Sequence, residues 1–403
     1  MRRVVITGMG IYSCIGKNLE EARTSLYNGI SGIVYDAERA EVGFRSLLTG
    51  MVEEPDLKKL LSRRQRMSLG EEGSYAYMAT IEALENAKID QAFLDENEVG
   101  VIYGNDSTAK AVVESNDKIR KKRDTTLVGS GAIFKAMNST ITMNLSTIFK
   151  LKGINLTISA ACASGSHSIG MGYHLIKSGA QDCIITGGAQ EINHLAMGSF
   201  DGLGVFAMHN DTPEKASRAY DANRDGFVIA GGGGMVVLEE LEHAKARGAK
   251  IYAELVGYGA TSDGADMVAP SGEGALRCMQ TAMSTVDGAI DYINAHGTST
   301  PAGDIVELKA VQQAFGDAIP PISSTKSLSG HSLGAAGVQE AIYTLLMMRD
   351  GFIAGSANIE TLDEAAENIP VQLATVEQQL DRVMSNSFGF GGTNASLVFQ
   401  RHA

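Results

Sequence analysis

The sequence contains no tryptophan, only seven prolines and only four cysteines among its 403 residues. The cysteines are widely spaced, so neither metal-ligand spacing nor a dense disulfide framework is present. No uninterrupted apolar run approaches the roughly 18 residues that a membrane-spanning helix needs. No Pro-rich linker marks a domain boundary. These absences argue against a disulfide-stapled secreted domain, a cysteine-rich metal site and a helical membrane protein.

Positive charge is also scarce, since 34 Lys and Arg face 47 Asp and Glu and leave a net charge of −13. This balance disfavours a partner such as duplex nucleic acid. Two basic clusters nevertheless stand out within residues 63–66 and 118–123. Their members are Arg63, Arg64, Arg66, Lys118, Arg120, Lys121, Lys122 and Arg123. The ordinary interpretation is a pair of solvated faces, and the alternative is a docking surface for an acidic partner.

The composition is that of an ordinary globular protein, with 44% hydrophobic and 20% charged residues. The length suffices for one large domain or two smaller ones. Arg2 and Arg3 precede a short apolar run, residues 4–6, which is too short for the core of a signal peptide. We expect this run to be the first strand and the protein to be cytoplasmic.

Strand-like and helix-like patterns alternate along the chain, which predicts an α/β protein. The expected strands are residues 4–7, 99–103, 155–159, 183–186, 234–238, 292–295, 322–324, 382–385 and 395–399. The expected helices are residues 73–87, 163–177, 275–285, 304–315 and 333–349. The order strand, turn, Gly-rich helix, strand and glycine cluster occurs in both halves of the chain. We therefore expect two fused α/β units, residues 1–248 and 249–403, although chance similarity of α/β units is an alternative.

Cys162 has the surroundings of a nucleophile rather than of a structural thiol. It lies in Ser-Ala-Ala-Cys-Ala-Ser-Gly, between a predicted strand and a predicted helix. A helix N-terminus supplies unpaired N–H groups and a positive dipole end, which lower the pKa of a thiol. The sequence therefore predicts an ionised, exposed sulfur at a sharp turn. Cys14, Cys183 and Cys278 lack this context, and a buried structural role is expected for them.

Two of the eight histidines lie in turns that follow strands of the second half. His296 is in Asn-Ala-His-Gly-Thr-Ser-Thr, and His331 is in Ser-Gly-His-Ser-Leu-Gly. A single loop histidine is usually structural, but two in such turns favour a convergent site. Glu340 lies on a helix face of small or apolar residues, where a carboxylate needs a partner, and Lys326 is a candidate. Alternatively, Glu340 lies at the surface.

The motif Asn-Ser-Phe-Gly-Phe-Gly-Gly-Thr-Asn, residues 386–394, resembles no dinucleotide-binding turn. Its glycines allow close backbone approach, so that an N–H in this turn can stabilise an oxyanion. Together with the Cys162, His296 and Lys326–His331 motifs, it makes the chain similar to the β-ketoacyl-acyl-carrier-protein synthases. The resemblance extends over essentially the whole chain, and residues 210–218 to 269–274 are most similar to synthase I of that family.

The resemblance implies a thiolase-like fold, with two α/β halves in five αβαβα layers, and a homodimer. It implies that Cys162 accepts the acyl group, that His296 and His331 serve decarboxylation and condensation, and that Lys326 and Glu340 form a supporting ion pair. The N–H groups of Cys162 and Phe390 would form the oxyanion hole, and Thr298 and Thr300 would hold phosphopantetheine. No cofactor is required, but the family suggests a structural monovalent cation at Asn294, Glu340, Ser385 and Asn386.

The implied partner is an acidic acyl carrier protein, for which the two basic clusters are the candidate docking surface. The reaction would be decarboxylative elongation of a fatty acid. A ketosynthase of a polyketide or aryl-polyene pathway is the alternative, as is a catalytically silent carrier-binding scaffold. The sequence departs from the family at residues 105–108, where relatives have glycines, and at 204–208. Candidate acyl-pocket residues are Met137, Met197, Phe200 and Phe227, although core packing is the more common role for any one of them.

Overall fold

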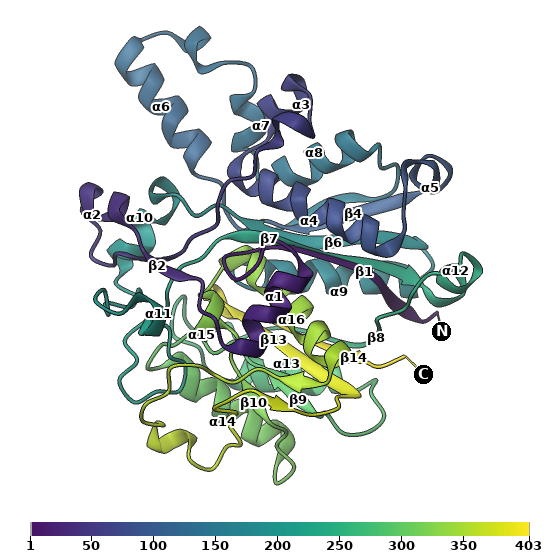
Figure 1. The fold of residues 1–403 in the computed structure, drawn as a ribbon, viewed down its shortest axis with the longest axis vertical. Coiled ribbons are helices and arrows are strands. Elements are labelled where there is room, and N and C mark those ends of the chain that lie inside the picture. The colour runs from purple at the N-terminus through teal and green to yellow at the C-terminus, as the bar shows by residue number, and fades with distance from the viewer. Residues whose placement is uncertain (1, 403) are drawn as a thin grey trace.

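The computed structural model describes residues 2–402 and shows one ten-stranded mixed sheet with two small two-stranded sheets (Figure 1). The order of the large sheet is β10-β9-β13-β14-β8-β1-β7-β6-β4-β5. Its strands are β1 (Val4–Tyr12), β4 (Val99–Gly104), β5 (Asn155–Ile158), β6 (Cys183–Gln190), β7 (Gly232–Glu240), β8 (Ala253–Ser262), β9 (Tyr292–Asn294), β10 (Ile322–Ser323), β13 (Arg382–Gly389) and β14 (Thr393–Gln400). The small sheets pair β2 (Ile33–Tyr35) with β3 (Leu48–Gly50) and β11 (Phe352–Ile353) with β12 (Val376–Glu377).

The two ends of the large sheet repeat one topology. From the edge inward, the strand order is β5-β4-β6-β7-β1 in one half and β10-β9-β13-β14-β8 in the other. When the five strands of each half are numbered along the chain, both orders read 3-2-4-5-1. The pairings also match, since the first two are parallel and the last two antiparallel in both sets. Within the sheet, the halves join through three residue pairs between β1 and β8. The internal repeat expected from the sequence is therefore present in the strand order.

Helices form three layers, one on each outer face of the sheet and one between its two halves (Figure 1). Helices α4 (Glu71–Ala87) and α8 (Thr140–Phe149) cover one outer face. On the other outer face, α13 (Glu273–Met283) packs on β8 and β14, with α14 (Gly303–Phe315) against it. Between the halves lie α9 (Ser164–Lys177) and α16 (Ala336–Asp350), which contact each other and strands of both halves. This αβαβα arrangement is the predicted thiolase-like fold.

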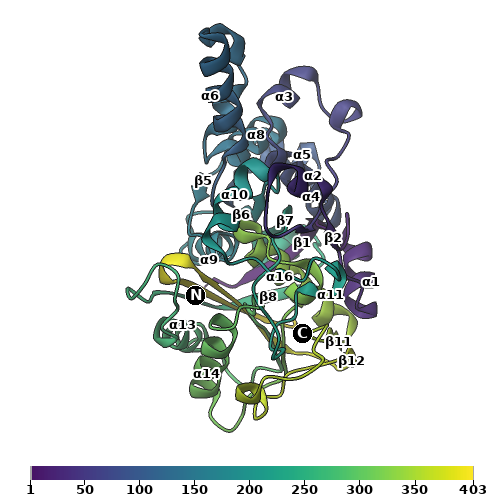
Figure 2. The ribbon, with the colours of Figure 1, turned by 90° about the vertical axis from the view of Figure 1, so that its left-hand side faces the viewer.

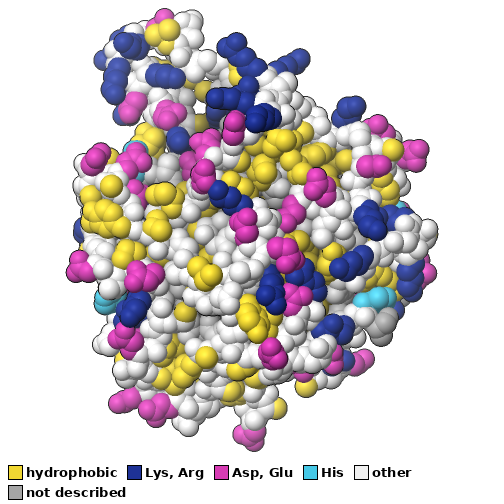
Figure 3. Space-filling view, in the orientation of Figure 1, with side chains coloured by type: hydrophobic (Ala, Val, Ile, Leu, Met, Phe, Trp, Pro, Cys, Tyr) yellow, Lys and Arg dark blue, Asp and Glu magenta, His cyan; other side chains and the backbone are white. Residues whose placement is uncertain are grey.

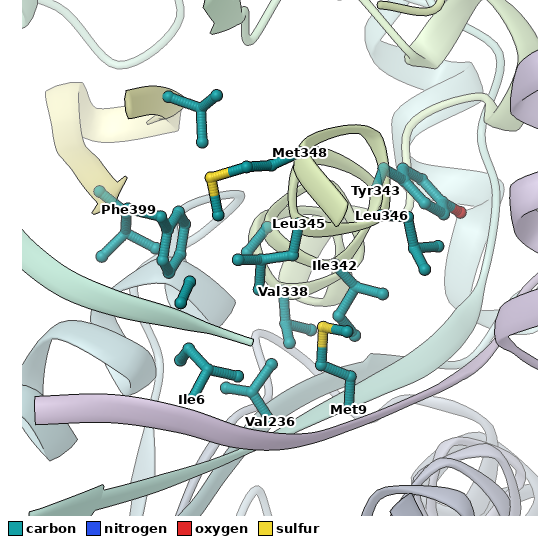
Figure 4. Packing of buried hydrophobic residues seen from close by; sticks show 14 of the residues in the cluster. Ile6, Met9, Val236, Val338, Ile342, Tyr343, Leu345, Leu346, Met348 and Phe399 are labelled. Carbon is teal, nitrogen blue, oxygen red and sulfur yellow. The ribbon is translucent and has the colours of Figure 1, made fainter. Parts of the chain in front are cut away.

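The central layer forms the largest hydrophobic core. Every residue of α16 from Ala336 to Met348 is buried, so this part of the helix has no solvent face. Figure 4 shows Val338, Ile342 and Leu345 of α16 packed on Ile6 and Val236 of the sheet. A helix that is buried all round is typical of the middle of a layered fold. It follows that a charged residue between Ala336 and Met348 must find its partner inside the protein.

An arm projects from the N-terminal half. It consists of α6 (Lys110–Lys122), the short 3₁₀ turn η2 (Thr125–Val128) and α7 (Ala132–Ala136), none of which buries a residue. Figure 2 shows α6 standing well clear of the sheet. The sequence analysis predicted neither α6 nor strand β8. Within residues 2–402, no helix combines the length and apolar character needed to cross a bilayer.

The remaining helices are mostly short and cover the edges of these layers. They are α1 (Leu19–Asn28), α2 (Ala37–Val42), α3 (Arg63–Ser68), α5 (Gln91–Glu96), α10 (His194–Leu203), α11 (Pro213–Ala216), α12 (Leu241–Ala246) and α15 (Lys326–Ser329). Of these, α3 packs against α7 and α8 beside the arm, and α15 carries Lys326 into the interior. These two helices bear on the site described next.

Candidate active site

Cys162 lies in a tight turn between β5 and α9, as predicted. Ala161 just before it has a φ of +46°, which a residue with a side chain adopts only when its surroundings impose it. Ser164 holds the turn, because its hydroxyl accepts the N–H of Ala160 at 2.8 Å and donates to the carbonyl of Ala161 at 2.7 Å. The turn leaves Cys162 7% exposed, at the wall of a cavity of about 370 Å³.

The predicted ionisation of Cys162 is wrong for this resting structure. Burial and the carboxyl group of Asp106 raise the pKa of the Cys162 thiol to about 12. Lys326 and the backbone N–H groups of Phe390 and of Cys162 itself oppose this rise without cancelling it. The helix N-terminus is therefore too weak to outweigh the loss of solvent around the sulfur. The sulfur is therefore a thiol, and its proton must leave before Cys162 can act as a nucleophile.

His296 and His331 meet at the same cavity. Their ring centroids are 5.2 Å apart with planes at 88°, and both rings line the cavity with Cys162. The carboxylate of Glu307 accepts the backbone N–H of His296 at 2.9 Å, and the carbonyl of Val228 accepts that of His331 at 2.7 Å. Burial and the nearby Lys326 hold the pKa of each histidine well below its ordinary value. Both imidazoles are therefore neutral at physiological pH.

Lys326 and Glu340 form the predicted ion pair, and the surface alternative for Glu340 is wrong. The Lys326 ammonium contacts Oε1 of Glu340, and neither side chain is more than 2% exposed. Burial raises the pKa of Glu340, and the Lys326 charge opposes that rise. The pair places one positive charge beside the sulfur and both imidazoles, which accounts for its effect on all three.

The glycine-rich motif turns at the cavity wall, where β13 ends in the short 3₁₀ turn η5 (Phe390–Gly392). Gly391 and Gly392 have φ values of +76° and +74°, which favour glycine. A Cβ on Gly389 would lie 3.0 Å from the backbone nitrogen of Cys162. This close approach brings the N–H of Phe390 to the sulfur of Cys162, so that two backbone donors face the reacting atom.

Thr298 and Thr300 line the same cavity, with their hydroxyl oxygens 3.1 Å apart. Of the four predicted acyl-pocket residues, Phe227 lines the cavity and packs edge-on against His331. Met197 and Phe200 do not line it, but pack in the apolar cluster that surrounds Cys162. Met137 follows α7 and is 41% exposed, so the structure does not bring it to the cavity of its own chain.

Glu307 is a site residue that the sequence analysis missed. Its two carboxylate oxygens accept the N–H groups of His296 and Gly297, and Asn386 donates to it at 3.4 Å. The side chain is 4% exposed and lies on the buried face of α14. A carboxylate on a buried helix face was the signal used for Glu340, and the same signal would have found Glu307.

The four residues of the predicted cation site lie together in the interior. Asn294 donates to the backbone carbonyl of Glu340 at 3.3 Å, and Ser385 pairs with Asn294 across β13 and β9. Oε2 of Glu340 and Oγ of Ser385 are buried without a hydrogen-bond partner in the described part of the chain. Asn386 is also buried. Unpartnered buried oxygens fit a hard monovalent cation.

The two basic clusters lie on neighbouring parts of one end of the molecule. Residues 63–66 belong to α3, and residues 118–123 form the end of α6. Both α3 and α6 contact α7, and Figure 3 shows Lys and Arg side chains gathered over this end. Every basic residue of these clusters is exposed except Arg66, which is half-buried.

The comparisons with known proteins agree with this architecture. The profile "Beta-ketoacyl synthase, N-terminal domain" matches residues 1–244, and "Beta-ketoacyl synthase, C-terminal domain" matches residues 252–360. A crystal structure of a β-ketoacyl synthase from Burkholderia phymatum is 36% identical, with a TM-score of 0.94 and full coverage of both chains. The chain belongs to the β-ketoacyl synthase family and is an acyltransferase of the condensing type.

Curated relatives are more similar still. "3-oxoacyl-[acyl-carrier-protein] synthase 1" of Haemophilus influenzae is 53% identical over 405 residues, with full coverage of both chains. The protein of the same name from Escherichia coli K12 is 51% identical over 404 residues, covering all of this chain and 99% of the relative. "3-oxoacyl-[acyl-carrier-protein] synthase 2" of Vibrio cholerae is 38% identical over 410 residues, covering 99% of both chains. The similarity is thus higher to type 1 than to type 2.

Proposed function

We propose that the protein is a 3-oxoacyl-acyl-carrier-protein synthase that elongates fatty acids. The carrying observation is that Cys162 and the pair His296 and His331 come from different halves of the chain and line one cavity. Full-length identity above 50% to relatives named synthase 1 favours fatty acid elongation. The polyketide alternative has weaker support, since the ketosynthase of a type II polyketide complex is 28% identical.

In the first half-reaction, the sulfur of Cys162 attacks the carbonyl of an acyl thioester on the carrier protein. The C–S bond to Cys162 forms, the bond to the phosphopantetheine sulfur breaks, and the proton of Cys162 leaves with the carrier thiol. The neutral imidazoles are the bases that can relay this proton. The N–H groups of Cys162 and Phe390 stabilise the oxyanion of the tetrahedral intermediate. The free carrier protein then departs.

In the second half-reaction, malonyl-carrier protein enters, with Thr298 and Thr300 holding its phosphopantetheine arm. The bond between the carboxylate and the methylene group breaks, CO₂ leaves, and its electron pair forms an enolate at the thioester. Neutral His296 and His331 each donate an N–H to that oxygen, which stabilises the negative charge. The enolate carbon attacks the acyl group on Cys162, whose thiolate leaves and takes up a proton. The product is a β-ketoacyl thioester two carbons longer.

Several further assignments belong to this proposal. The boundary between the two units lies near residue 248, between α12 and β8. Asn294, Glu340, Ser385 and Asn386 would hold a structural monovalent cation, which would contact the unpartnered Oε2 of Glu340 and Oγ of Ser385 and supply no chemistry. The basic clusters dock the acidic carrier protein.

Met197, Phe200 and Phe227 surround the acyl chain at Cys162. Four unpaired cysteines fit a reducing, cytoplasmic location.

A homodimer fits the edge of the large sheet. Strand β5 lies at that edge, and its first two residues, Asn155 and Leu156, are exposed. An exposed edge strand with an apolar side chain is a site for pairing with a second copy. Such a dimer also offers Met137 a place, because a residue exposed in one chain can reach the neighbouring subunit.

The proposal is tested by following the acyl group and the product separately. After incubation with acyl-carrier protein, intact-mass analysis should show one acyl adduct on Cys162, and added malonyl-carrier protein should convert it to the β-ketoacyl product. Cys162→Ala should abolish the adduct and the product, whereas the matched control Cys14→Ala should retain both. Product formation at the wild-type rate by Cys162→Ala would refute the nucleophile. Preference for polyketide-type starters over saturated acyl chains would favour the alternative pathway.

A further inference from the structure

Arg224 is a buried arginine in the loop between α11 and β7, and its guanidinium group binds the segment that carries the two threonines of the cavity. Nε donates to the backbone carbonyl of Thr300 at 3.2 Å, and Nη2 donates to that of Pro301 at 3.0 Å. Nη1 donates to the carbonyl of Asp221 at 2.7 Å and to the carboxylate of Asp363 at 2.8 Å. Arg224 does not itself line the cavity, so it acts on the cavity wall through these contacts.

Asp304, in the first turn of α14, binds the N–H groups of the same segment. Its Oδ1 accepts the N–H of Ser299 at 3.1 Å and that of Thr300 at 3.3 Å, and its Oδ2 lies 3.2 Å from Nε of Arg224. The side chain is fully buried. Burial raises the pKa of the Asp304 carboxyl to about 7, and the Arg224 charge opposes that rise. Arg224 and Asp304 thus form one buried pair that holds both carbonyl and N–H groups of the threonine segment.

The segment needs this support, because its central residue has an unfavourable backbone conformation. Ser299 has a φ of +73°, in the left-handed region that residues with a side chain rarely adopt. It lies between Thr298 and Thr300, whose hydroxyl oxygens are 3.1 Å apart at the cavity wall. Such a conformation persists only where the surroundings determine it. The placement of the two hydroxyl groups therefore depends on the contacts that Arg224 and Asp304 make with the backbone.

The geometry of a guanidinium group is needed for these contacts. Its planar fork directs donors at the carbonyls of Thr300 and Pro301 and at two carboxylates at the same time. A lysine in place of Arg224 would keep the positive charge, but its ammonium group is a single point and cannot reproduce this fork. Replacement by lysine therefore separates the positioning of the threonine segment from the charge balance of Asp304.

Arg218 is a natural comparison, because it is as buried as Arg224 and lies in the same loop. Its guanidinium group donates to the carbonyl of Lys215 at 3.0 Å and lies 3.8 Å from the carboxylate of Asp221. In the described part of the chain, that group makes no hydrogen bond to residues 298–301. A change of the Arg218 side chain therefore perturbs a buried arginine without releasing the threonine segment.

We propose that Arg224 is a positioning residue, whose guanidinium group fixes the backbone of residues 298–301 so that the hydroxyl groups of Thr298 and Thr300 face the phosphopantetheine arm. This inference rests on the proposed function, in which the two threonines hold that arm. Arg224 contacts neither the arm nor the reacting atoms. Loss of its fork should therefore weaken the binding of the substrate and leave the chemistry at Cys162 unchanged.

The experiment compares wild type, Arg224→Lys and the matched control Arg218→Lys. CO₂ release is measured from malonyl-pantetheine, which presents the arm without the carrier protein. Arg224→Lys should raise KM about tenfold, as the loss of a well-placed hydrogen bond does, and keep kcat within about twofold of wild type. Alkylation of Cys162 by iodoacetamide, which needs no arm, should proceed at the wild-type rate. A wild-type KM in Arg224→Lys, or the same rise in Arg218→Lys, would overturn the assignment.

A second comparison asks whether Arg224 acts through the threonines. The variant Thr298→Val/Thr300→Val should itself raise KM, and the addition of Arg224→Lys should change that KM by no more than about twofold. Two independent effects would instead multiply, and that result would overturn the inference. If Arg224→Lys does not fold, Arg224→Gln replaces it under the same criteria.

Failure of this inference is distinguishable from failure of the proposed function. A wild-type KM in Thr298→Val/Thr300→Val would show that the threonines do not hold the arm, and the role of Arg224 would be refuted with theirs. The nucleophile would be unaffected by that result, because the acyl adduct on Cys162 and its loss in Cys162→Ala are measured separately.

Discussion

The ammonium group of Lys326 and the carboxylate of Glu340 form an ion pair in which neither side chain is more than 2% exposed. Lys326 comes from α15 and Glu340 from the buried part of α16, so the pair links the loop of His331 to the central layer. The same ammonium group lowers the pKa of both active-site histidines. One buried charge pair therefore affects both folding and the protonation of the site.

Removal of one partner should destabilise the protein far more than removal of both. Lys326→Met leaves an unpaired buried carboxylate, for which a loss of roughly 3–5 kcal/mol in the free energy of unfolding is typical. The double variant Lys326→Met/Glu340→Leu should recover much of that loss, because it leaves no unpaired charge. Denaturant unfolding measures both. A double variant that is less stable than either single variant would contradict this account.

The double variant should also alter the pH dependence of decarboxylation. Each histidine has a pKa well below its ordinary value, so each is neutral and competent at neutral pH and loses competence when acid protonates it. Since Lys326 is one cause of that depression, its removal should raise both pKa values. The acid limb of CO₂ release from malonyl-carrier protein should move to higher pH. An unmoved limb would show that burial alone keeps the imidazoles neutral.

Glu307→Gln should impair decarboxylation more than acyl transfer. The two carboxylate oxygens hold the backbone of His296 and Gly297, and an amide offers only one acceptor for these two donors. A displaced His296 should reduce CO₂ release by roughly 10- to 100-fold. Acylation of Cys162, followed by intact-mass analysis, should fall less, because His331 remains in place to relay the proton of the thiol. Equal losses in both half-reactions would indicate general misfolding.

The end of α6 should matter for carrier-protein binding mainly at low ionic strength. Lys121→Glu/Lys122→Glu reverses two exposed charges without removing any buried contact. The KM for acyl-carrier protein should rise severalfold at about 0.05 M salt, and the difference should vanish near 1 M, where the Debye length is about 3 Å. The control Lys250→Glu changes charge in the other half. If the α6 variant and wild type had the same KM at low and high salt, these residues would be a solvated surface and not a docking site.

The sequence predicted the strands that follow ordinary patterns, including all of the strands that carry the site. It missed β8, because the glycines of that strand have low strand propensity. The structure explains them, since a Cβ on Gly257 would lie 2.1 Å from the carbonyl oxygen of Ala282, and one on Gly259 would lie 2.0 Å from that of Cys278. Both glycines serve the close packing of α13 on the sheet. This long-range requirement cannot be recognised from residues 253–262 alone.

The sequence predicted most residues of the site but not their electrostatics. The turns at Cys162, His296 and His331 carry local signals, so their positions were recognisable from the sequence. The pKa of Cys162 was misjudged, because a helix N-terminus is visible in sequence and the burial of the sulfur is not. The contribution of Asp106 was also hidden, since its residue number is distant from Cys162 and only the parallel pairing of β4 and β5 brings the two together. The sequence motifs therefore did not predict pKa shifts that depend on burial in the folded protein.

A buried carboxylate remote from the site should make stability fall in acid. Burial would raise the pKa of Glu239, but hydrogen bonds from Arg247, His243 and Thr7 lower it to about 2. A depressed acid pKa stabilises the fold above the ordinary value near 4.5, and this contribution of roughly 3 kcal/mol is lost as the pH falls toward 2. Glu239→Gln should therefore lower the free energy of unfolding at pH 7 and converge with wild type near pH 2, whereas the exposed control Glu242→Gln should follow wild type throughout. A constant offset between Glu239→Gln and wild type from pH 7 to pH 2 would show that packing, rather than charge, accounts for the loss.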